Sequence, residues 1–185
     1  TFINFEHGSY EGFHLSSTTG VAVARIGWHP DREFVFFENS FSWQQRFSIY
    51  HELQFDQVHA SPITVASAPP AVSRSFLTVR FEPVKYIELD LSENYFRDFP
   101  TYDPRLLGTG LLDKYLFQGL SGRVRVNLPY HSFVYTSIGQ SSRTGDAKSN
   151  WNKMFGAGMR DILRTGIGAD VHYTQFDSSF ARGSY

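Results

Sequence analysis

Residues 86–95 decide the fold class, because they read Tyr-Ile-Glu-Leu-Asp-Leu-Ser-Glu-Asn-Tyr and alternate apolar with polar side chains. The apolar set is Ile87, Leu89, Leu91 and Tyr95, and the polar set is Glu88, Asp90, Ser92 and Asn94. A period of two residues is that of a β-strand whose two faces differ. The stretch therefore predicts a strand with one apolar and one polar face.

The segment before this strand has the same alternation. Its apolar residues are Leu77, Val79 and Phe81, and its polar residues are Thr78, Arg80 and Glu82. The two segments are joined by Pro83-Val84-Lys85, which is short enough for a tight turn. We therefore expect a β-hairpin here.

The pattern recurs in three further pairs of segments. The expected hairpins join 37–44 to 47–56, 120–128 to 133–140, and 151–159 to 167–173, with bends near 45–46, 129–131 and 160–163. Weaker patterns precede them at residues 2–7 and 21–28. The sequence thus predicts an all-β chain, an antiparallel up-and-down meander of about eight to ten strands. We expect a single β domain over residues 1–185, in which 1–30 are weakly patterned.

One segment has a competing interpretation. Trp151, Met154, Phe155 and Met159 also recur at roughly helical spacing within residues 141–161. The Gly156-Ala157-Gly158 sequence weakens a helix interior, and the flanking strands need a partner. A strand is favoured, with a helix as the alternative.

The connections between the hairpins are longer than the turns within them. They cover residues 58–73, 98–117 and 141–150, and the first two contain prolines. Outer-membrane barrels keep short turns on one side and long loops on the other. Soluble sandwiches also gather long functional loops at one end. The asymmetry favours a membrane barrel and leaves a sandwich open.

Composition excludes several function classes. Lys and Arg number 17 and Asp and Glu 18, so the electrostatic basis for nucleic-acid binding is missing. There is no cysteine, which excludes disulfides, thiolate metal sites and cysteine nucleophiles. No run of about 18 apolar residues is present, so no spanning helix is expected. Spanning strands are compatible with this composition, and the aromatic content of 17% suits strands and membrane interfaces.

The chain resembles a porin-type bacterial outer-membrane β-barrel, on the strength of the hairpins at residues 76–95, 120–140 and 151–173. The resemblance implies that the apolar rows face lipid and that tyrosines near strand ends form aromatic girdles. These tyrosines are Tyr86, Tyr95, Tyr130, Tyr135 and Tyr173. It implies a lumen lined by Glu88, Asp90, Arg123, Arg125, Asp170 and His172.

The function implied by the resemblance is a passive pore or a structural membrane component, as a whole barrel or a segment of a larger one. The expected partners are membrane lipid and small solutes, the expected location is the bacterial outer membrane, and no cofactor is expected. The alternative is a secreted or periplasmic β-sandwich or small barrel that binds a glycan or another small ligand through aromatic loops. Residues 5–13 weakly resemble the first strand of some carbohydrate-binding sandwiches.

Acidic and histidine side chains are the candidates for chemistry in this sequence. His51, Asp56 and His59 lie close in sequence, but Asp56 and His51 fall on opposite faces of a continuous strand, which favours a structural role. Asp170 and His172 share a face, and Asp–His pairs orient catalytic imidazoles. No motif ties a serine to them. A lumen-lining pair is therefore favoured, and no catalytic residue is assigned.

The remaining candidates are charged and glycine residues. Arg123 and Arg125 are opposite in charge to Glu88 and Asp90, so neighbouring strands would bring them into ion pairs or a selectivity feature. The Gly-x-Gly sequences at 108–110, 156–158 and 166–168 match no phosphate-binding fingerprint. They are expected at turns and strand bends.

Overall fold

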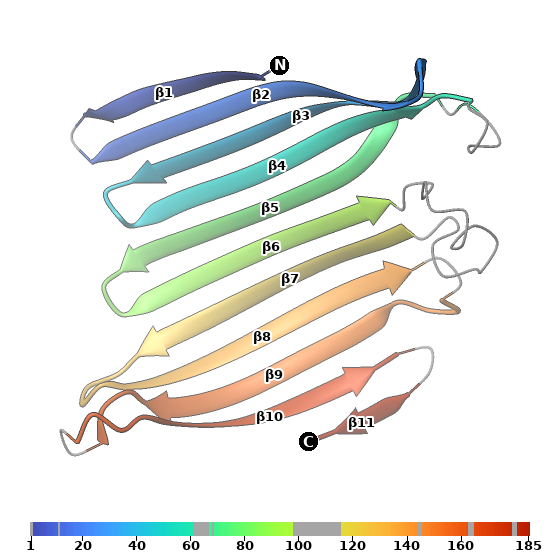
Figure 1. Ribbon diagram of the computed structural model, residues 1–185. Helices are drawn as coiled ribbons and strands as arrows, with labels where there is room; N and C mark the ends of the chain where they lie inside the picture. Colours follow the sequence, from blue (N-terminus) through green and yellow to red (C-terminus); the bar gives the residue numbers. More distant parts are fainter. Residues whose placement is uncertain are drawn as a thin grey trace.

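The computed structural model describes residues 2–10, 12–60, 67, 69–97, 116–143, 146–162, 165–178 and 181–185. They form one antiparallel sheet in which every strand pairs with its neighbours in the chain (Figure 1). The strands are β1 Phe2–Tyr10, β2 Phe13–Ile26, β3 His29–Trp43, β4 Phe47–Val58, β5 Ala71–Val84, β6 Ile87–Arg97, β7 Leu116–Asn127, β8 Ser132–Arg143, β9 Asn150–Met159, β10 Ala169–Asp177 and β11 Arg182–Ser184. The predicted all-β meander is confirmed.

The four expected hairpins are present as β3–β4, β5–β6, β7–β8 and β9–β10. The helical alternative for residues 141–161 is wrong, since β9 pairs with both β8 and β10 along its length. One turn was predicted too short. β10 begins at Ala169 and not at Ile167, so residues 160–168 connect it to β9.

The sequence pattern did not predict the first half of β2. Residues 14–19 read His-Leu-Ser-Ser-Thr-Thr, which places hydroxyl side chains on both faces and removes the two-residue alternation. These residues nevertheless pair with β1 on one side and β3 on the other. Backbone pairing with two neighbouring strands thus stabilises a strand that the sequence alternation of these residues does not predict.

Two tight turns use residues other than glycine in the left-handed region. Gln44 and Gln45 have φ values of 49° and 57°, and Tyr130 and His131 have 61° and 58°. Positive φ at both central residues is typical of turns whose twist matches the strands of a hairpin. The usual Asn-Gly signal is missing at both places, so only the change of strand pattern could locate these turns from sequence.

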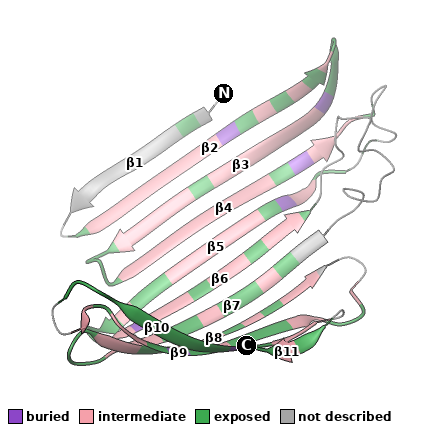
Figure 2. Cartoon of the chain, turned by 60° about the horizontal axis from the view of Figure 1, so that its bottom comes forward, coloured by how far each residue is buried: buried purple, intermediate pink, exposed green. Residues whose placement is uncertain are grey.

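The sheet is curved and open. Figure 1 spreads all the strands side by side, whereas in Figure 2 β2–β6 stay side by side and β8–β11 overlap, as expected when a sheet bends along its width. Among the described residues, β1 pairs only with β2 and β11 only with β10. The sheet is therefore not closed into a barrel, and its edges are β1 at one side and β10 with the short β11 at the other.

The two faces of the sheet differ in chemistry along the rows that cross it from β3 to β10. Directly paired residues project from the same side of a sheet, so the register defines each face. We call apolar face the side that carries the row Trp43, Phe47, Phe81, Leu89, Val124, Thr136, Phe155 and Tyr173. We call polar face the side that carries the row Ser42, Ser48, Arg80, Asp90, Arg123, Ser137, Met154 and Thr174.

The apolar face is reinforced by contacts between rings on neighbouring strands. Phe13 lies edge-on to Phe41 with centroids 5.0 Å apart, Phe41 to Phe47 at 5.8 Å, and Phe47 to Phe81 at 6.1 Å. Edge-to-face pairs of this kind contribute about 0.5–1.5 kcal/mol each beyond area burial. They tie β2, β3, β4 and β5 together near their tight turns.

Candidate functional site

The charged residues predicted to line a lumen all lie on the polar face. Their positions are Glu88 and Asp90 on β6, Arg123 and Arg125 on β7, and Asp170 and His172 on β10. Glu88 pairs directly with Arg125, and Asp90 pairs with Arg123. The row through Arg125 continues over Tyr135 and Gly156 to His172. The antiparallel register thus brings them into one band across β6–β10.

An ion-pair network occupies the β5–β7 end of this band. Arg80 Nη2 lies 2.5 Å from Glu88 Oε1, and its Nε lies 3.6 Å from Asp90 Oδ1. Arg123 Nη2 lies 2.6 Å from Asp90 Oδ2 and 3.4 Å from Glu88 Oε1. Both carboxylates are therefore shared by the same two guanidinium groups. The expected pairing of β6 acids with a β7 arginine is present, and Arg80 from β5 completes it.

Burial within the network is uneven. The side chain of Glu88 is 9% exposed, whereas Arg80 and Arg123 are 48% and 44% exposed. An exposed ion pair contributes only about 0–1 kcal/mol. A buried carboxylate that loses its counter-charges is penalised much more strongly. Glu88 is therefore the member of the network that most depends on its partners.

Arg125 makes a different contact. Its guanidinium carbon lies 3.9 Å from the centroid of the Phe133 ring, in cation–π geometry. Its Nε is buried without a hydrogen-bond partner. The Phe133 ring stacks on Tyr135 with centroids 6.1 Å apart. Arg125 is thus held by an aromatic pair on β8, and among the described residues no ion pair involves it.

Asp170 joins β8 to β10 across the intervening strand. The Tyr135 hydroxyl donates to Asp170 Oδ1 at 3.0 Å, and His172 Nδ1 lies 3.2 Å from the same oxygen. The predicted Asp–His pair on β10 is therefore in contact, and its third partner is a phenol. This arrangement orients the imidazole of His172.

Two glycines of β9 make this contact possible. A Cβ on Gly156 would lie 2.3 Å from Tyr135 Cζ, and one on Gly158 would lie 2.5 Å from Phe133 Cζ. The rings of β8 therefore pass over β9 where it has no side chains. The Gly156-Ala157-Gly158 sequence was expected at a turn or a strand bend. It lies within β9 and provides space for two aromatic rings.

The candidates His51, Asp56 and His59 do not converge. His51 lies on the apolar face opposite Leu77, and Asp56 lies on the polar face. Asp56 accepts a hydrogen bond from Arg32 Nε at 2.5 Å, and His59 Nε2 lies 3.2 Å from Glu33 Oε2. Within the described part of the chain, no group of three or more His, Asp or Glu side chains is placed to hold a metal ion.

The tyrosines predicted for the aromatic girdles are distributed over turns and both faces. Tyr86 and Tyr130 are exposed in the β5–β6 and β7–β8 turns, and Tyr95 and Tyr173 lie on the apolar face. Tyr135 lies instead on the polar face, because it pairs with Arg125. Its hydroxyl is bonded to Asp170 and so belongs to the charged band.

Sequence reasoning overlooked Arg80 as a site residue and Tyr135 as a polar partner. The two-residue alternation of the sequence could have placed both on the polar face. Arg80 alternates with Val79 and Phe81, and Tyr135 is separated by an even number of residues from Ser137 and Gly139 but is adjacent to Val134. The glycine pair that accommodates the rings carries no such signal, because its role depends on which strand lies beside it.

The residues that are buried here are polar, whereas a soluble domain buries hydrophobic side chains in a dry core. No hydrophobic side chain is buried among the described residues, whereas Asp56, Glu88 and Thr174 on the polar face are 7%, 7% and 1% exposed. The large hydrophobic side chains that are exposed within strands lie on the apolar face. They include Val21, Trp43, Phe81, Leu91, Leu120, Val124, Ile138, Phe155, Val171 and Tyr173. Contiguous exposed apolar surface of this extent marks an interaction with a membrane or a protein.

Comparisons with known proteins add no relative. No family model matches the chain, and neither the curated proteins nor the solved structures contain a significant match. In the described residues, no helix has the length and apolar character needed to cross a membrane.

Proposed function

We propose that this chain forms membrane-spanning strands of a bacterial outer-membrane β-barrel, as a whole barrel or a segment of one, and acts as a passive pore or a structural membrane component. One observation carries the proposal: exposed apolar side chains cover one face of the sheet, while the buried residues Asp56, Glu88 and Thr174 are polar and lie on the other face. Hydrocarbon is the solvent that reverses burial in this way, since spanning strands alternate apolar residues toward lipid with polar residues toward the lumen.

Strand length supports the same proposal. A tilted strand crosses a bilayer in about 9–11 residues. From β2 to β9 the strands have 10 to 15 residues. Each is therefore long enough to span the hydrocarbon, and the strands of 12 to 15 residues also extend beyond it. Strands of soluble domains have about 5–6 residues on average.

The lengths of the connections also support it. At one end of the sheet, β3–β4, β5–β6 and β7–β8 are joined by tight turns (Figure 1). At the other end, residues 59–70 and 98–115 join β4 to β5 and β6 to β7. Long loops on one side and short turns on the other are typical of outer-membrane barrels. The short β2–β3 turn and the longer β9–β10 connection are local departures from this rule.

The aromatic side chains fit two membrane interfaces. Tyr86, Tyr130 and Trp43 lie at the end with the tight turns, whereas Tyr95 and Trp151 lie toward the opposite end. Amphipathic rings prefer the headgroup level. Under this proposal the bilayer lies between the two sets, lipid contacts the apolar face, and small solutes meet the charged band of the polar face.

Fractionation of the cells that make the protein tests the proposal directly. We expect the chain in the outer-membrane fraction, extracted by detergent, with a gel mobility that changes on heating because the folded sheet resists dodecyl sulfate. Recovery of folded protein from the aqueous fraction without detergent would refute the proposal and favour a secreted or periplasmic ligand-binding protein.

A further inference from the structure

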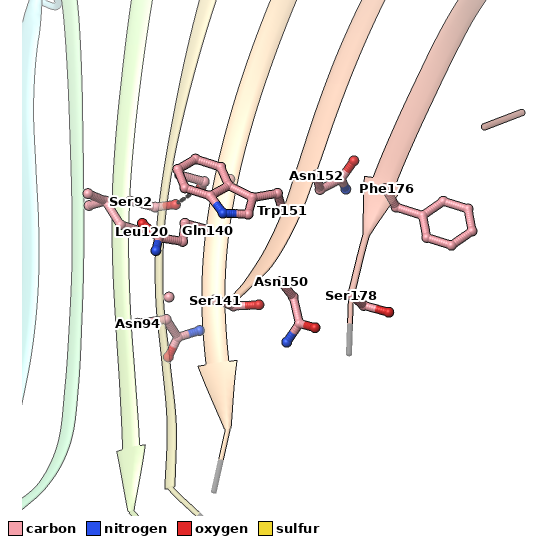
Figure 3. Close-up of a pocket in the computed structure, with 13 residues that line it drawn as sticks. Ser92, Asn94, Leu120, Gln140, Ser141, Asn150, Trp151, Asn152, Phe176 and Ser178 are labelled. Carbon is pink, nitrogen blue, oxygen red and sulfur yellow. Dashed lines mark hydrogen bonds between the residues drawn. The ribbon is translucent and has the colours of Figure 1, made fainter. Parts of the chain in front are cut away.

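A hollow of about 350 Å³ lies next to the charged band, toward the end of the sheet with the long loops (Figure 3). Six of its polar lining residues come from β6, β7, β8 and β9: Ser92, Asn94, Ser121, Ser141, Asn150 and Asn152. The register places these six on the polar face in two adjacent rows, 92–121–139–152 and 94–119–141–150. The lining also includes Ser178, which follows β10, and Leu120, Gln140 and Trp151, which the register places on the apolar face.

Glycines create this depression. Gly119 and Gly139 occupy positions in the two rows where a side chain would otherwise project. A Cβ on Gly139 would meet Ser121 Cβ at 3.5 Å, which is ordinary contact. A small side chain therefore fits there without strain, and a larger one would fill the hollow.

The hollow is lined by neutral groups. The charged network stops at Asp90 and Arg123, one row away, where both carboxylates and both guanidiniums are already paired with one another. Ser92 and Ser121 are joined by a hydrogen bond of 2.6 Å between their hydroxyls. At the far rim, Lys148 is paired with Asp177. An ionic ligand would find no charged side chain in the lining to compensate its charge.

Hydroxyl and carboxamide groups both donate and accept hydrogen bonds, as the hydroxyls of a sugar do. The volume is within the usual range of small-molecule sites. Phe176 borders the hollow, but its ring lies over Gly183 on β11. The centroid of the ring is 6.4 Å from that of Tyr185, so the ring packs toward β11. Recognition by hydrogen bonds, rather than by stacking on this ring, is what the lining supports.

We infer that this hollow, here named the neutral subsite, binds a small neutral polyhydroxylated solute of the mono- or disaccharide class. The inference deepens the proposed function and rests on it only for the statement that the bound molecule is a solute of the pore. Binding itself requires only the arrangement of β6–β9.

Saturation-transfer NMR on the full chain, with glucose and maltose as probes, tests the inference. Gluconate and glucosamine serve as charged analogues of similar size. We expect saturation transfer to both neutral probes and at least tenfold weaker binding of the charged analogues, because the lining holds no counter-charge.

Variants locate the binding. Gly139→Val fills the hollow, and Asn152→Leu replaces a carboxamide by an apolar group of similar size, so each should weaken maltose binding at least tenfold. Gly122→Val is the matched control, because Gly122 lies on the apolar face of the adjacent strand and has room for a Cβ, with Asp90 O at 3.9 Å. It should bind maltose as the unmodified chain does.

The inference is overturned if neither neutral probe binds at millimolar concentration, if the charged analogues bind equally well, or if Gly139→Val binds as the unmodified chain does. Equal loss in Gly122→Val would also overturn it, since binding would then not depend on this hollow. These outcomes are independent of extraction behaviour. A chain that binds maltose but needs no detergent refutes the membrane proposal alone, and one that needs detergent but binds no sugar refutes the neutral subsite alone.

Discussion

Gly156 is the residue on which the contact between β8 and β10 depends. We expect Gly156→Ala to lower the free energy of unfolding by about 1–3 kcal/mol, because the added methyl overlaps the Tyr135 ring. Urea unfolding of the refolded protein in detergent measures this change. Gly122→Ala is the control, since its Cβ has room.

Removal of the ring should reverse much of the effect. In the Tyr135→Ala background, Gly156→Ala should cost less than in the unmodified chain, because the overlap is gone. An equal cost in both backgrounds would mean that the glycine is needed for another reason, such as backbone conformation.

The shared carboxylate of Glu88 makes a second prediction at this scale. Arg80→Gln and Arg123→Gln should each cost about 1 kcal/mol or less, because the other guanidinium still compensates Glu88. The double variant should lose at least about 1 kcal/mol more than the sum, since the buried carboxylate then has neither partner. Free energies of unfolding from urea titrations give the coupling.

A pair of substitutions whose effects on the free energy of unfolding are additive serves as the control for that coupling. Arg74 pairs with Glu52 in a separate contact 3.3 Å long. Arg74→Gln combined with Arg123→Gln should therefore be additive within about 0.5 kcal/mol. A double variant of Arg80 and Arg123 that is equally additive would contradict the shared network.

At the residue scale, parity alone predicted which charged side chains share a face. It could not predict that Tyr135 bonds to Asp170, because this contact requires knowing that β9 lies between β8 and β10 and carries Gly156 at the crossing point. Long-range partners of a side chain depend on register, and register is a property of pairs of strands.

At the element scale, β6 offers a direct comparison of its two faces. Leu91 lies on the apolar face and is 43% exposed, and its neighbour Ser92 lies on the polar face. Leu91→Arg should lower the stability of the lipid-embedded protein by about 2–4 kcal/mol if this face meets hydrocarbon. Ser92→Arg should cost less than about 1 kcal/mol, because it adds a charge to the polar side.

Folding into lipid vesicles at a series of urea concentrations measures both values. Equal costs at the two positions would contradict the assignment of one face to lipid. If both variants instead fold in detergent-free buffer with equal free energies of unfolding, water would be present on both sides of β6.

A strand could be predicted from the sequence where apolar and polar residues alternate along it. β5–β8 were predicted because each contains an alternating stretch, as in residues 77–82, 86–95 and 120–128. The first half of β2 was missed because serine and threonine occupy both of its faces. β9 was open to a helical interpretation because its aromatic and methionine residues fit two periods, and only its pairing with β8 and β10 decides between them.

At the scale of the whole molecule, the three tryptophans provide a test of the proposal that the apolar face contacts lipid. Trp43 and Trp151 lie on the apolar face, whereas Trp28 is 92% exposed in the β2–β3 turn. In single-tryptophan variants within brominated phospholipid vesicles, we expect strong quenching of Trp43 and Trp151 and little of Trp28. Aqueous acrylamide should give the reverse order. Uniform quenching of all three would exclude a bilayer that covers only the apolar face.

The sequence predicted the meander and the identity of its two faces, but not whether the sheet closes. Alternation of apolar and polar residues assigns each side chain to a face but does not predict the curvature of the sheet. Curvature depends on the twist and the stagger that accumulate over all strands. The open arrangement of β1 and β11 is accordingly a property that no single segment of the sequence encodes.

The open edges of the sheet have a consequence for the proposed location in a membrane. Along the outer sides of β1 and of residues 169–173 in β10, no strand formed by the described residues pairs with the backbone amides and carbonyls. Hydrocarbon provides no donor or acceptor, and each such group left unmatched there costs several kcal/mol. If the chain spans a bilayer as proposed, each of these edges therefore has to pair with a further strand before it can lie in hydrocarbon.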